Sequence, residues 1–177
     1  ECIYNQMVPG EILEPVYKEA VKAEVSIAVY NDAEKELIAA NGVTRYIDAD
    51  ARACDVAVRE TDDFVKVVNF GFNKIMLSGE PDSMKNIEKH MREMFGDKVN
   101  VFRSDPHFVE LLPKYVDKGV AVEKLMRYLD INREKVICVG DSINDMPMLR
   151  YAGMGVAMGN AQDKVKQAAD YVTLSHN

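Results

Sequence analysis

From Asp117 to Thr173 the sequence alternates helix-like and strand-like segments, and this alternation predicts a parallel β-sheet. Glu134–Val139 is expected to be a strand buried on both faces of that sheet, because its apolar residues follow one another without alternation. After this strand we expect a strand over Gly153–Met158, an Asn-capped helix over Asn160–Ala169 and a strand over Tyr171–Thr173. We therefore predict an α/β core with part of a doubly wound, Rossmann-like sheet.

The preceding part of the chain has a different pattern, with strands at hairpin-like spacing and two long helices. Apolar residues recur at helical spacing from Leu13 to Ala20 and again from Met84 to Phe95, and residues 43–60 are compatible with a further helix. Strands are expected over Cys2–Met7, Val25–Val29, Glu36–Ala40, Phe72–Ser78, Val99–Arg103 and His107–Leu112. These elements predict an α+β cap domain with an antiparallel sheet covered by helices on one side.

The change of pattern near Pro113 predicts two domains, a cap over residues 9–113 and a partial core formed by residues 1–8 and 114–177. The core segment is too short for a complete doubly wound sheet, and the chain begins at Glu1 rather than at Met. We therefore expect these 177 residues to be a fragment whose core is completed by further segments.

The composition argues against two classes of partner. The chain carries 22 basic and 29 acidic side chains, a formal charge of −7, whereas nucleic acids and anionic membranes bind basic surfaces. The strongest apolar run, Val136–Val139, is four residues long, and a membrane-spanning helix needs about 20. Three cysteines without a CxxC pair indicate reduced thiols and a cytoplasmic location.

The loop that follows the Glu134–Val139 strand carries two aspartates, Asp141 and Asp145. Ligands of open parallel sheets bind beyond the carboxyl ends of the strands, which is where this loop lies. Two carboxylates about 5 Å apart repel by roughly 3 kcal/mol at an effective dielectric near 20, and Mg²⁺ is a natural counterion. The alternative is that Asp141 ends a strand and Asp145 caps a helix.

Lys118 favours the first interpretation. The spacing of the apolar residues Val122, Leu125, Met126 and Leu129 predicts a helix that Asp117 caps. Lys118 lies in the first turn of this helix, where the helix dipole disfavours a cation by roughly 0.3–1 kcal/mol. A lysine beside the small Gly119 can direct its ammonium toward a phosphate near the strand edge. The alternative is a solvated lysine beside Asp117.

Three motifs together resemble the haloacid dehalogenase superfamily, and within it the Cof-like phosphatases. They are Lys118-Gly119 at the start of a helix, the hydrophobic strand followed by Gly140-Asp141-Ser142-Ile143-Asn144-Asp145, and Gly155-Val156-Ala157-Met158-Gly159-Asn160-Ala161. The resemblance covers residues 107–177, and residues 9–106 are similar to the cap of that family in general layout.

The resemblance implies a role for each matching residue. Lys118 would be a catalytic lysine that neutralises the phosphoryl group and the nucleophilic carboxylate. Asp141 and Asp145 would bind Mg²⁺ directly or through water, and Ser142 would help to shape the metal loop. Asn144 would bind the phosphate. Such neutralisation and positioning are what phosphoryl transfer requires.

The nucleophile of this family, a pair of aspartates in a DxD motif at the end of the first strand, has no match here. The only DxD, Asp48-Ala49-Asp50, follows no hydrophobic strand and lies inside the predicted cap. We therefore expect a Mg²⁺-dependent phosphatase of small phosphorylated metabolites, such as sugar phosphates, present here as an inactive part. The alternatives are a phosphomutase and a non-catalytic metabolite-binding module. The substrate and the oligomeric state stay open.

Overall fold

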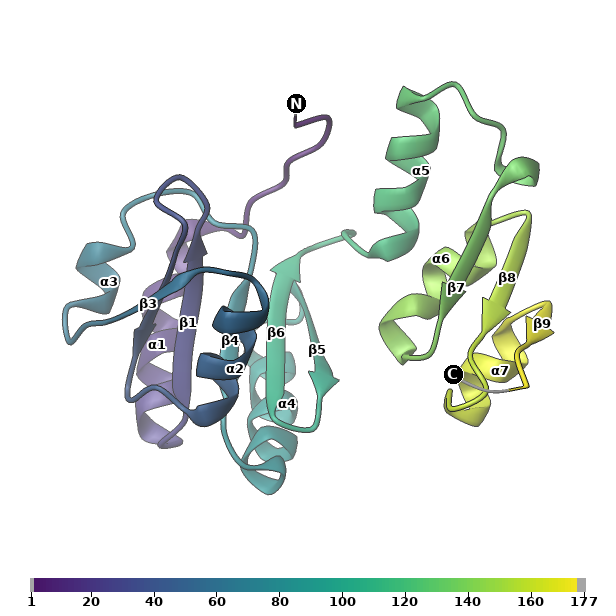
Figure 1. The fold of residues 1–177 in the computed structure, drawn as a ribbon. Helices are drawn as coiled ribbons and strands as arrows, with labels where there is room; N and C mark the ends of the chain where they lie inside the picture. The colour runs from purple at the N-terminus through teal and green to yellow at the C-terminus, as the bar shows by residue number, and fades with distance from the viewer. Residues whose placement is uncertain (1, 175–177) are drawn as a thin grey trace. The chain divides into compact units, whose positions relative to one another are not determined.

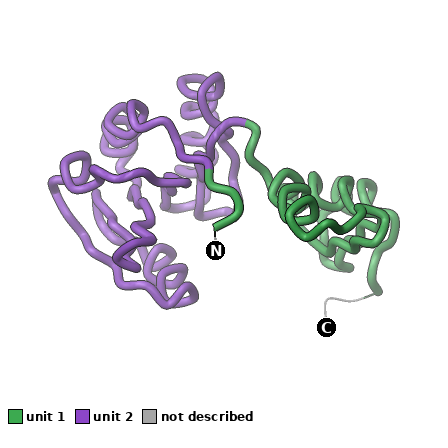
Figure 2. Tube along the Cα trace, turned by 90° about the horizontal axis from the view of Figure 1, so that it is seen from above, with its two compact units in different colours: residues 1–5, 115–177 green, residues 6–114 purple. Residues whose placement is uncertain are grey.

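The computed structural model describes residues 2–174, and its chain divides into two compact units (Figure 1). Unit 1 comprises residues 1–5 and 115–177, and unit 2 comprises residues 6–114, as the two colours of Figure 2 show. Within residues 2–174 no helix combines the length and the apolar character that crossing a membrane requires.

Unit 2 is built on a six-stranded sheet with the strand order β3-β2-β1-β4-β6-β5. Neighbouring strands are antiparallel, except that β2 and β3 are parallel. The strands are β1 (Ser26–Asn31), β2 (Glu36–Ala40), β3 (Ala57–Glu60), β4 (Ile75–Ser78), β5 (Val99–Asp105) and β6 (Phe108–Pro113). The helices are η1 (Gly10–Ile12), α1 (Leu13–Lys22), α2 (Arg45–Ala53), α3 (Phe64–Val67) and α4 (Pro81–Phe95).

Buried clusters lie on both faces of this sheet. Residues of α1, α3 and α4 join the larger cluster on one face, and Ile47 and Ala51 of α2 pack with Ala28 of β1 on the other. The one-sided cover expected from the sequence is therefore wrong, because residues 43–60 form α2 and β3 and α2 covers part of the second face. For the same reason β1 is buried along most of its length instead of alternating.

The helix predicted from Met84 to Phe95 is present as α4, with Met84, Ile87, Met91 and Phe95 buried. The strand expected over Cys2–Met7 is wrong: none of residues 2–7 belongs to a strand. A β-strand needs a neighbouring strand to satisfy its backbone N–H and C=O groups. Among the described residues, no strand of either sheet pairs with residues 2–7.

Unit 1 contains a three-stranded parallel sheet with the order β7-β8-β9. Its elements are α5 (Lys118–Tyr128), η2 (Arg133–Lys135), β7 (Ile137–Gly140), η3 (Ile143–Asp145), α6 (Met146–Tyr151), β8 (Met154–Ala157), α7 (Asp163–Ala168) and β9 (Tyr171–Val172). The predicted partial doubly wound sheet is confirmed by the parallel pairing of successive strands joined by helices.

Two details of unit 1 differ from the expectation. Strand β7 is buried on one face only: Cys138 is 7% exposed, but Ile137 is 64% and Val139 51% exposed. The buried cluster of this unit, to which α6 and α7 contribute, lies on the Cys138 side alone. Helix α7 begins at Asp163 after the cap residue Gln162, so the prediction that Asn160 caps it is wrong.

Candidate active site

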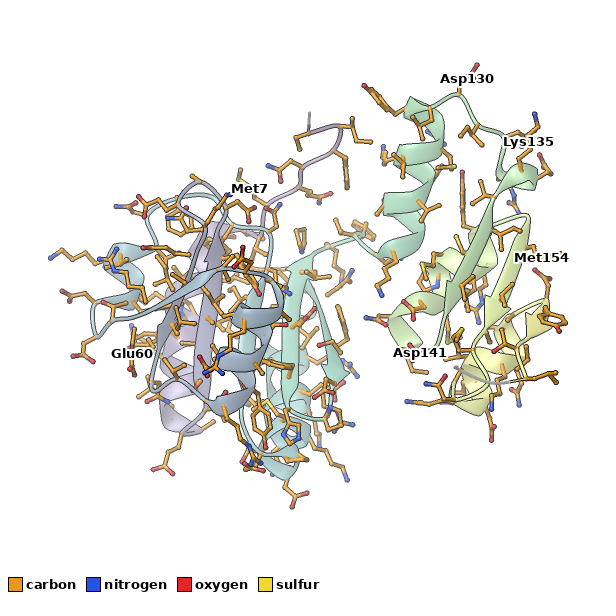
Figure 3. All side chains as sticks on the ribbon, in the orientation of Figure 1. Met7, Glu60, Asp130, Lys135, Asp141 and Met154 are labelled. Carbon is orange, nitrogen blue, oxygen red and sulfur yellow. The ribbon has the colours of Figure 1, made fainter. Side chains whose placement is uncertain are left out.

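The loop after β7 is held together by the side chain of Asp145. Gly140 ends the strand, Asp141 follows it, and residues 143–145 form the single turn η3. Oδ2 of Asp145 accepts hydrogen bonds from the backbone N–H of Asp141 and of Ser142, both at 3.0 Å. The loop therefore folds back on itself at the carboxyl end of a parallel strand, where Figure 3 labels Asp141.

Gly140 makes this fold-back possible. A Cβ at position 140 would lie 2.5 Å from Cβ of Asp145 and 2.7 Å from its Oδ2. Real Cβ atoms do not approach other heavy atoms so closely. The residue type at 140 is thus required by the position of the Asp145 carboxylate.

Lys118 reaches the same carboxylate from helix α5. The helix begins at Lys118 after Asp117, whose side chain accepts from the backbone N–H of Val120 at 2.9 Å. Nζ of Lys118 donates to Oδ1 of Asp145, forming an ion pair across 27 residues of sequence. The Asp145 side chain is 6% exposed and that of Lys118 is 51% exposed, so the ammonium keeps a solvent-facing side.

A second glycine brings the two elements together. A Cβ at Gly119 would lie 2.8 Å from the carbonyl carbon and oxygen of Pro147. Pro147 stands in the first turn of α6, directly after the loop. The first turn of α5 can therefore pack directly against the start of α6. This close packing places Lys118 within hydrogen-bond distance of Asp145.

The surroundings of Asp145 keep it ionised. Burial acts to raise the pKa of this carboxyl, but the Lys118 ammonium and the amides of Ser142 and Asp141 outweigh it, so the pKa lies below its ordinary value. Each stabilises the charged form by donating to it. At neutral pH the loop thus contains a buried carboxylate paired with a half-exposed ammonium.

Asp141 has its own partners and remains partly exposed. Oγ of Ser142 donates to its Oδ1 at 3.1 Å, and Nδ2 of Asn160 donates to its Oδ2 at 3.1 Å. The contact with Asn160, in the turn after β8, was not anticipated. The Gly155–Ala161 motif contains this residue, but the sequence predicts for it only a strand, a helix cap and the family resemblance, without a contact to Asp141.

Asn144 lies in the η3 turn between the two aspartates. Its Oδ1 is buried and has no hydrogen-bond partner within the described part of the chain. An unsatisfied buried amide oxygen is uncommon and calls for an explanation. Its position in the loop is compatible with a residue that is completed by a ligand.

The structure thus brings Lys118, Asp141, Ser142 and Asp145 into one hydrogen-bonded group, with Asn144 in the same turn. Asp48 and Asp50 are elsewhere, on α2 in unit 2. Asp48 pairs with Arg52, and Asp50 accepts from the hydroxyl of Tyr30 at 2.5 Å. Both aspartates of the DxD sequence therefore have partners within unit 2.

The donor set of the loop is compatible with Mg²⁺. Asp141 is partly exposed, and each of its carboxylate oxygens accepts one hydrogen bond from the protein. In Asp145, one oxygen accepts from Lys118 and the other from two backbone amides. No cluster of three or more His, Cys, Asp or Glu suited to a metal occurs among the described residues. Mg²⁺ is commonly held by one or two carboxylates together with water and phosphate oxygens, and this loop can provide such a partial set.

Comparisons with known proteins find haloacid dehalogenase-like hydrolases and phosphatases. A family model described as haloacid dehalogenase-like hydrolase matches residues 1–177. A crystal structure of a haloacid dehalogenase-like hydrolase from Bacteroides thetaiotaomicron is 36% identical and superposes with a TM-score of 0.84. The match covers 96% of this chain and 63% of that one.

Two curated relatives from Bacillus subtilis are 36% identical over shorter stretches. The phosphatase YwpJ matches over 67% of this chain and 38% of its own length. The 5-amino-6-(5-phospho-D-ribitylamino)uracil phosphatase YcsE matches over 60% of this chain and 40% of its own length. The matched stretches span well under half the length of these two relatives.

Proposed function

Because this chain belongs to the haloacid dehalogenase-like hydrolases, we propose that it serves a phosphatase that acts on small phosphorylated metabolites. The observation that carries the proposal is the ion pair of Lys118 with Asp145 at the carboxyl end of β7. It holds a half-exposed cation from α5 at the loop that also carries the partly exposed carboxylate of Asp141. This is the charge arrangement that a phosphate ester and a divalent cation together require.

The proposed roles follow from the contacts. Asp145 fixes the loop and holds the Lys118 ammonium, whose exposed side neutralises the phosphoryl oxygens. The amide of Asn144 binds the phosphate. The Asp141 carboxylate would hold Mg²⁺, with Ser142 donating a hydrogen bond to it and Asp145 fixing the backbone of Asp141. When bound, Mg²⁺ would supply Lewis-acid neutralisation of phosphoryl charge. Asn160 positions Asp141 through the hydrogen bond to its Oδ2.

We assign the carboxylate that attacks phosphorus to none of these 177 residues. Asp48 and Asp50 lie on helix α2 and not at the end of a strand, and each already has a protein partner, Arg52 for Asp48 and Tyr30 for Asp50. We propose that the residues of unit 1 supply charge neutralisation and metal binding, and that the attacking carboxylate comes from outside this sequence.

Unit 2 is proposed to be the cap that selects the substrate, over residues 9–113, with residues 1–8 and 114–177 contributing to the core. The division of the chain into compact units supports this assignment. The name of the Bacillus subtilis relative YcsE, a phosphatase of a phosphorylated ribityl compound, supports sugar-phosphate-like substrates. The three free cysteines, Cys2, Cys54 and Cys138, support a cytoplasmic location.

The test is release of inorganic phosphate by the complete gene product from a panel of sugar phosphates, with and without Mg²⁺. Lys118→Met is expected to lower kcat by about 10²-fold or more, as the loss of a charge-stabilising donor does in other enzymes. Lys164→Met, on the surface of α7, is the matched control. Turnover that is independent of Mg²⁺ and unchanged in Lys118→Met would contradict the proposal, and transfer of phosphate within the substrate without release would indicate a phosphomutase.

A further inference from the structure

The helix α2 covers only part of its face of the unit 2 sheet. The buried cluster under this helix consists of residues of α2, β1, β2 and β4, and Phe108 of β6 packs at its edge. Among the described residues, none from β5 belongs to this cluster. We call the remaining part of this face, formed by Phe102 of β5 and by Phe108, Glu110 and Leu112 of β6, the open face. All four of its side chains are partly exposed.

Glu110 stands in the middle of the open face, among apolar side chains. It pairs with Met76 of β4 on one side and with Phe102 of β5 on the other. Along β6 it lies between Phe108 and Leu112, whose side chains point to the same face because strand residues alternate. An apolar side chain would suit these surroundings, so the carboxylate at this position needs an explanation.

Lys74, just before β4, forms an ion pair with this carboxylate. Its Nζ donates to Oε1 of Glu110 at 3.3 Å and lies 5.3 Å from the centroid of the Tyr30 ring. The side chains of Lys74 and Glu110 are only 29% and 17% exposed. Replacing a buried ion pair by packed apolar residues is often neutral or stabilising. Stability therefore gives little reason for this pair, and charges that break a local packing rule point to a function.

Both members of the pair have hydrogen-bonding groups left for a ligand. In the part of the chain that the structure describes, Glu110 accepts only from Lys74, through Oε1, so Oε2 can accept from a ligand. The ammonium of Lys74 has further N–H donors beside the one given to Glu110. Because the two charges cancel, neither a simple anion nor a simple cation is favoured. Hydroxyl groups, which are neutral and both donate and accept, match the pair.

The position of Lys74 in unit 2 also fits a contact with substrate. The residue before it, Asn73, donates from Nδ2 to the backbone oxygen of Gln6 at 2.7 Å. Nε2 of Gln6 in turn donates to the backbone oxygen of Lys114 at 3.2 Å. Gln6 and Lys114 are the residues at which the chain enters and leaves unit 2. Lys74 thus lies next to the segments through which unit 2 continues into the rest of the chain.

We propose that Glu110 and Lys74 determine substrate specificity by binding neighbouring hydroxyl groups in the organic part of the phosphate ester. Oε2 of Glu110 accepts from one hydroxyl, and the ammonium of Lys74 donates to another. The ring of Phe102 packs against the C–H groups between them. This inference rests on the proposed phosphatase function and narrows its substrates to phosphate esters of sugars or polyols whose organic part is uncharged.

The test compares kcat/KM of the complete gene product for ribitol phosphate, which is rich in hydroxyls, and for phenyl phosphate, which has none in its organic part. In Glu110→Leu and in Lys74→Met, the ratio of the two values is expected to fall by about tenfold or more, because each variant loses a charge-assisted hydrogen bond to a hydroxyl. The matched controls are Glu93→Leu and Lys89→Met. These residues form an exposed ion pair on α4, 3.9 Å apart, and their replacement is expected to leave the ratio unchanged.

The ratio separates a specificity role from a structural one. Loss of folded protein lowers both kcat/KM values equally and leaves their ratio unchanged, and Lys74→Met tests the pair even where Glu110→Leu does not fold. A ratio equal to that of the wild type in both variants would overturn this inference while the phosphatase proposal stands. Release of phosphate from neither ester by the wild-type product would instead contradict the proposed function, and this inference with it.

Discussion

The carboxylate of Asp145 is shared between Lys118, which donates to one oxygen, and the backbone amides of Asp141 and Ser142, which donate to the other. A residue at the start of α5 and the loop after β7 are therefore fixed to one another through a single side chain. The same contact both builds the loop and positions the cation, so its loss is expected to affect stability and binding together.

Replacing Lys118 by Met leaves the buried Asp145 carboxylate without its cation. We expect the free energy of unfolding of unit 1 to fall by about 1–3 kcal/mol at neutral pH. The pKa of Asp145 is lowered in the folded state, so this contribution is present above the ordinary carboxyl pKa and disappears as the pH falls through the lowered value. Hydrogen exchange of the Asp141 and Ser142 amides measures it. An equal effect of Lys164→Met would contradict the account.

Gly140→Ala tests the steric requirement for the loop. The added Cβ would lie within 2.7 Å of three atoms of Asp145, so the carboxylate must move, and overpacking of this kind costs about 1–3 kcal/mol. The control is Gly10→Ala, where a Cβ would meet nothing within 4 Å. Thermal unfolding followed by circular dichroism compares the two. Equal melting temperatures for both variants would show that the loop tolerates a side chain at position 140.

Tyr30 predicts a dependence of stability on alkaline pH. Burial and the hydrogen bonds with Asp50 and Cys54 raise the pKa of its hydroxyl far above the ordinary value. Because the folded pKa is raised, the stabilisation is complete below about pH 10, where unfolded tyrosine is neutral, and is lost as the pH rises above that value. Tyr30→Phe is expected to flatten the decline in unfolding free energy between about pH 9 and 11.

Tyr171→Phe is the matched control for this measurement, since Tyr171 is 57% exposed. A decline that is equally steep in Tyr30→Phe and in the wild type would contradict the assigned role of Tyr30. It would also remove the reason for regarding Asp50 as a structural residue.

The sequence was sufficient to predict the elements whose patterns are strong and local. Helix α4 follows the spacing of Met84, Ile87, Met91 and Phe95, and β2 has the predicted bounds. The approach of Lys118 to the Gly140–Asp145 loop was also expected, because a lysine in the first turn of a helix is electrostatically unfavourable unless it has a partner.

Features that depend on distant parts of the chain could not be predicted in this way. Ile137 and Val139 have the apolar character of buried strand residues, but their exposure depends on which face the helices cover. Asn160 has the residue type of a helix cap, but its amide bonds to Asp141, which lies 19 residues earlier. Local sequence patterns predict which secondary structure a residue favours, and tertiary contacts decide which face is buried and which groups form hydrogen bonds.

Because the only DxD sequence, Asp48-Ala49-Asp50, lies on helix α2 and not at the end of a strand, we expect the 177-residue chain to hydrolyse no phosphate ester by itself. The measurement is release of the aryl alcohol from a generic aryl phosphate in the presence of Mg²⁺. Turnover that is abolished by Lys118→Ala would show that the chain contains its own nucleophile and would contradict this expectation.

The central claim is that Mg²⁺ and phosphate are bound by the loop at the end of β7. The direct measurement is a titration of the chain with Mg²⁺ and inorganic phosphate, followed through the NMR amide resonances of Asp141, Ser142 and Asn144, with Asp163→Asn as the matched control for Asp141→Asn. The account predicts saturable shifts of these resonances in the wild type and in Asp163→Asn, and their loss in Asp141→Asn. Absence of shifts in the wild type, or identical shifts in Asp141→Asn, would contradict it.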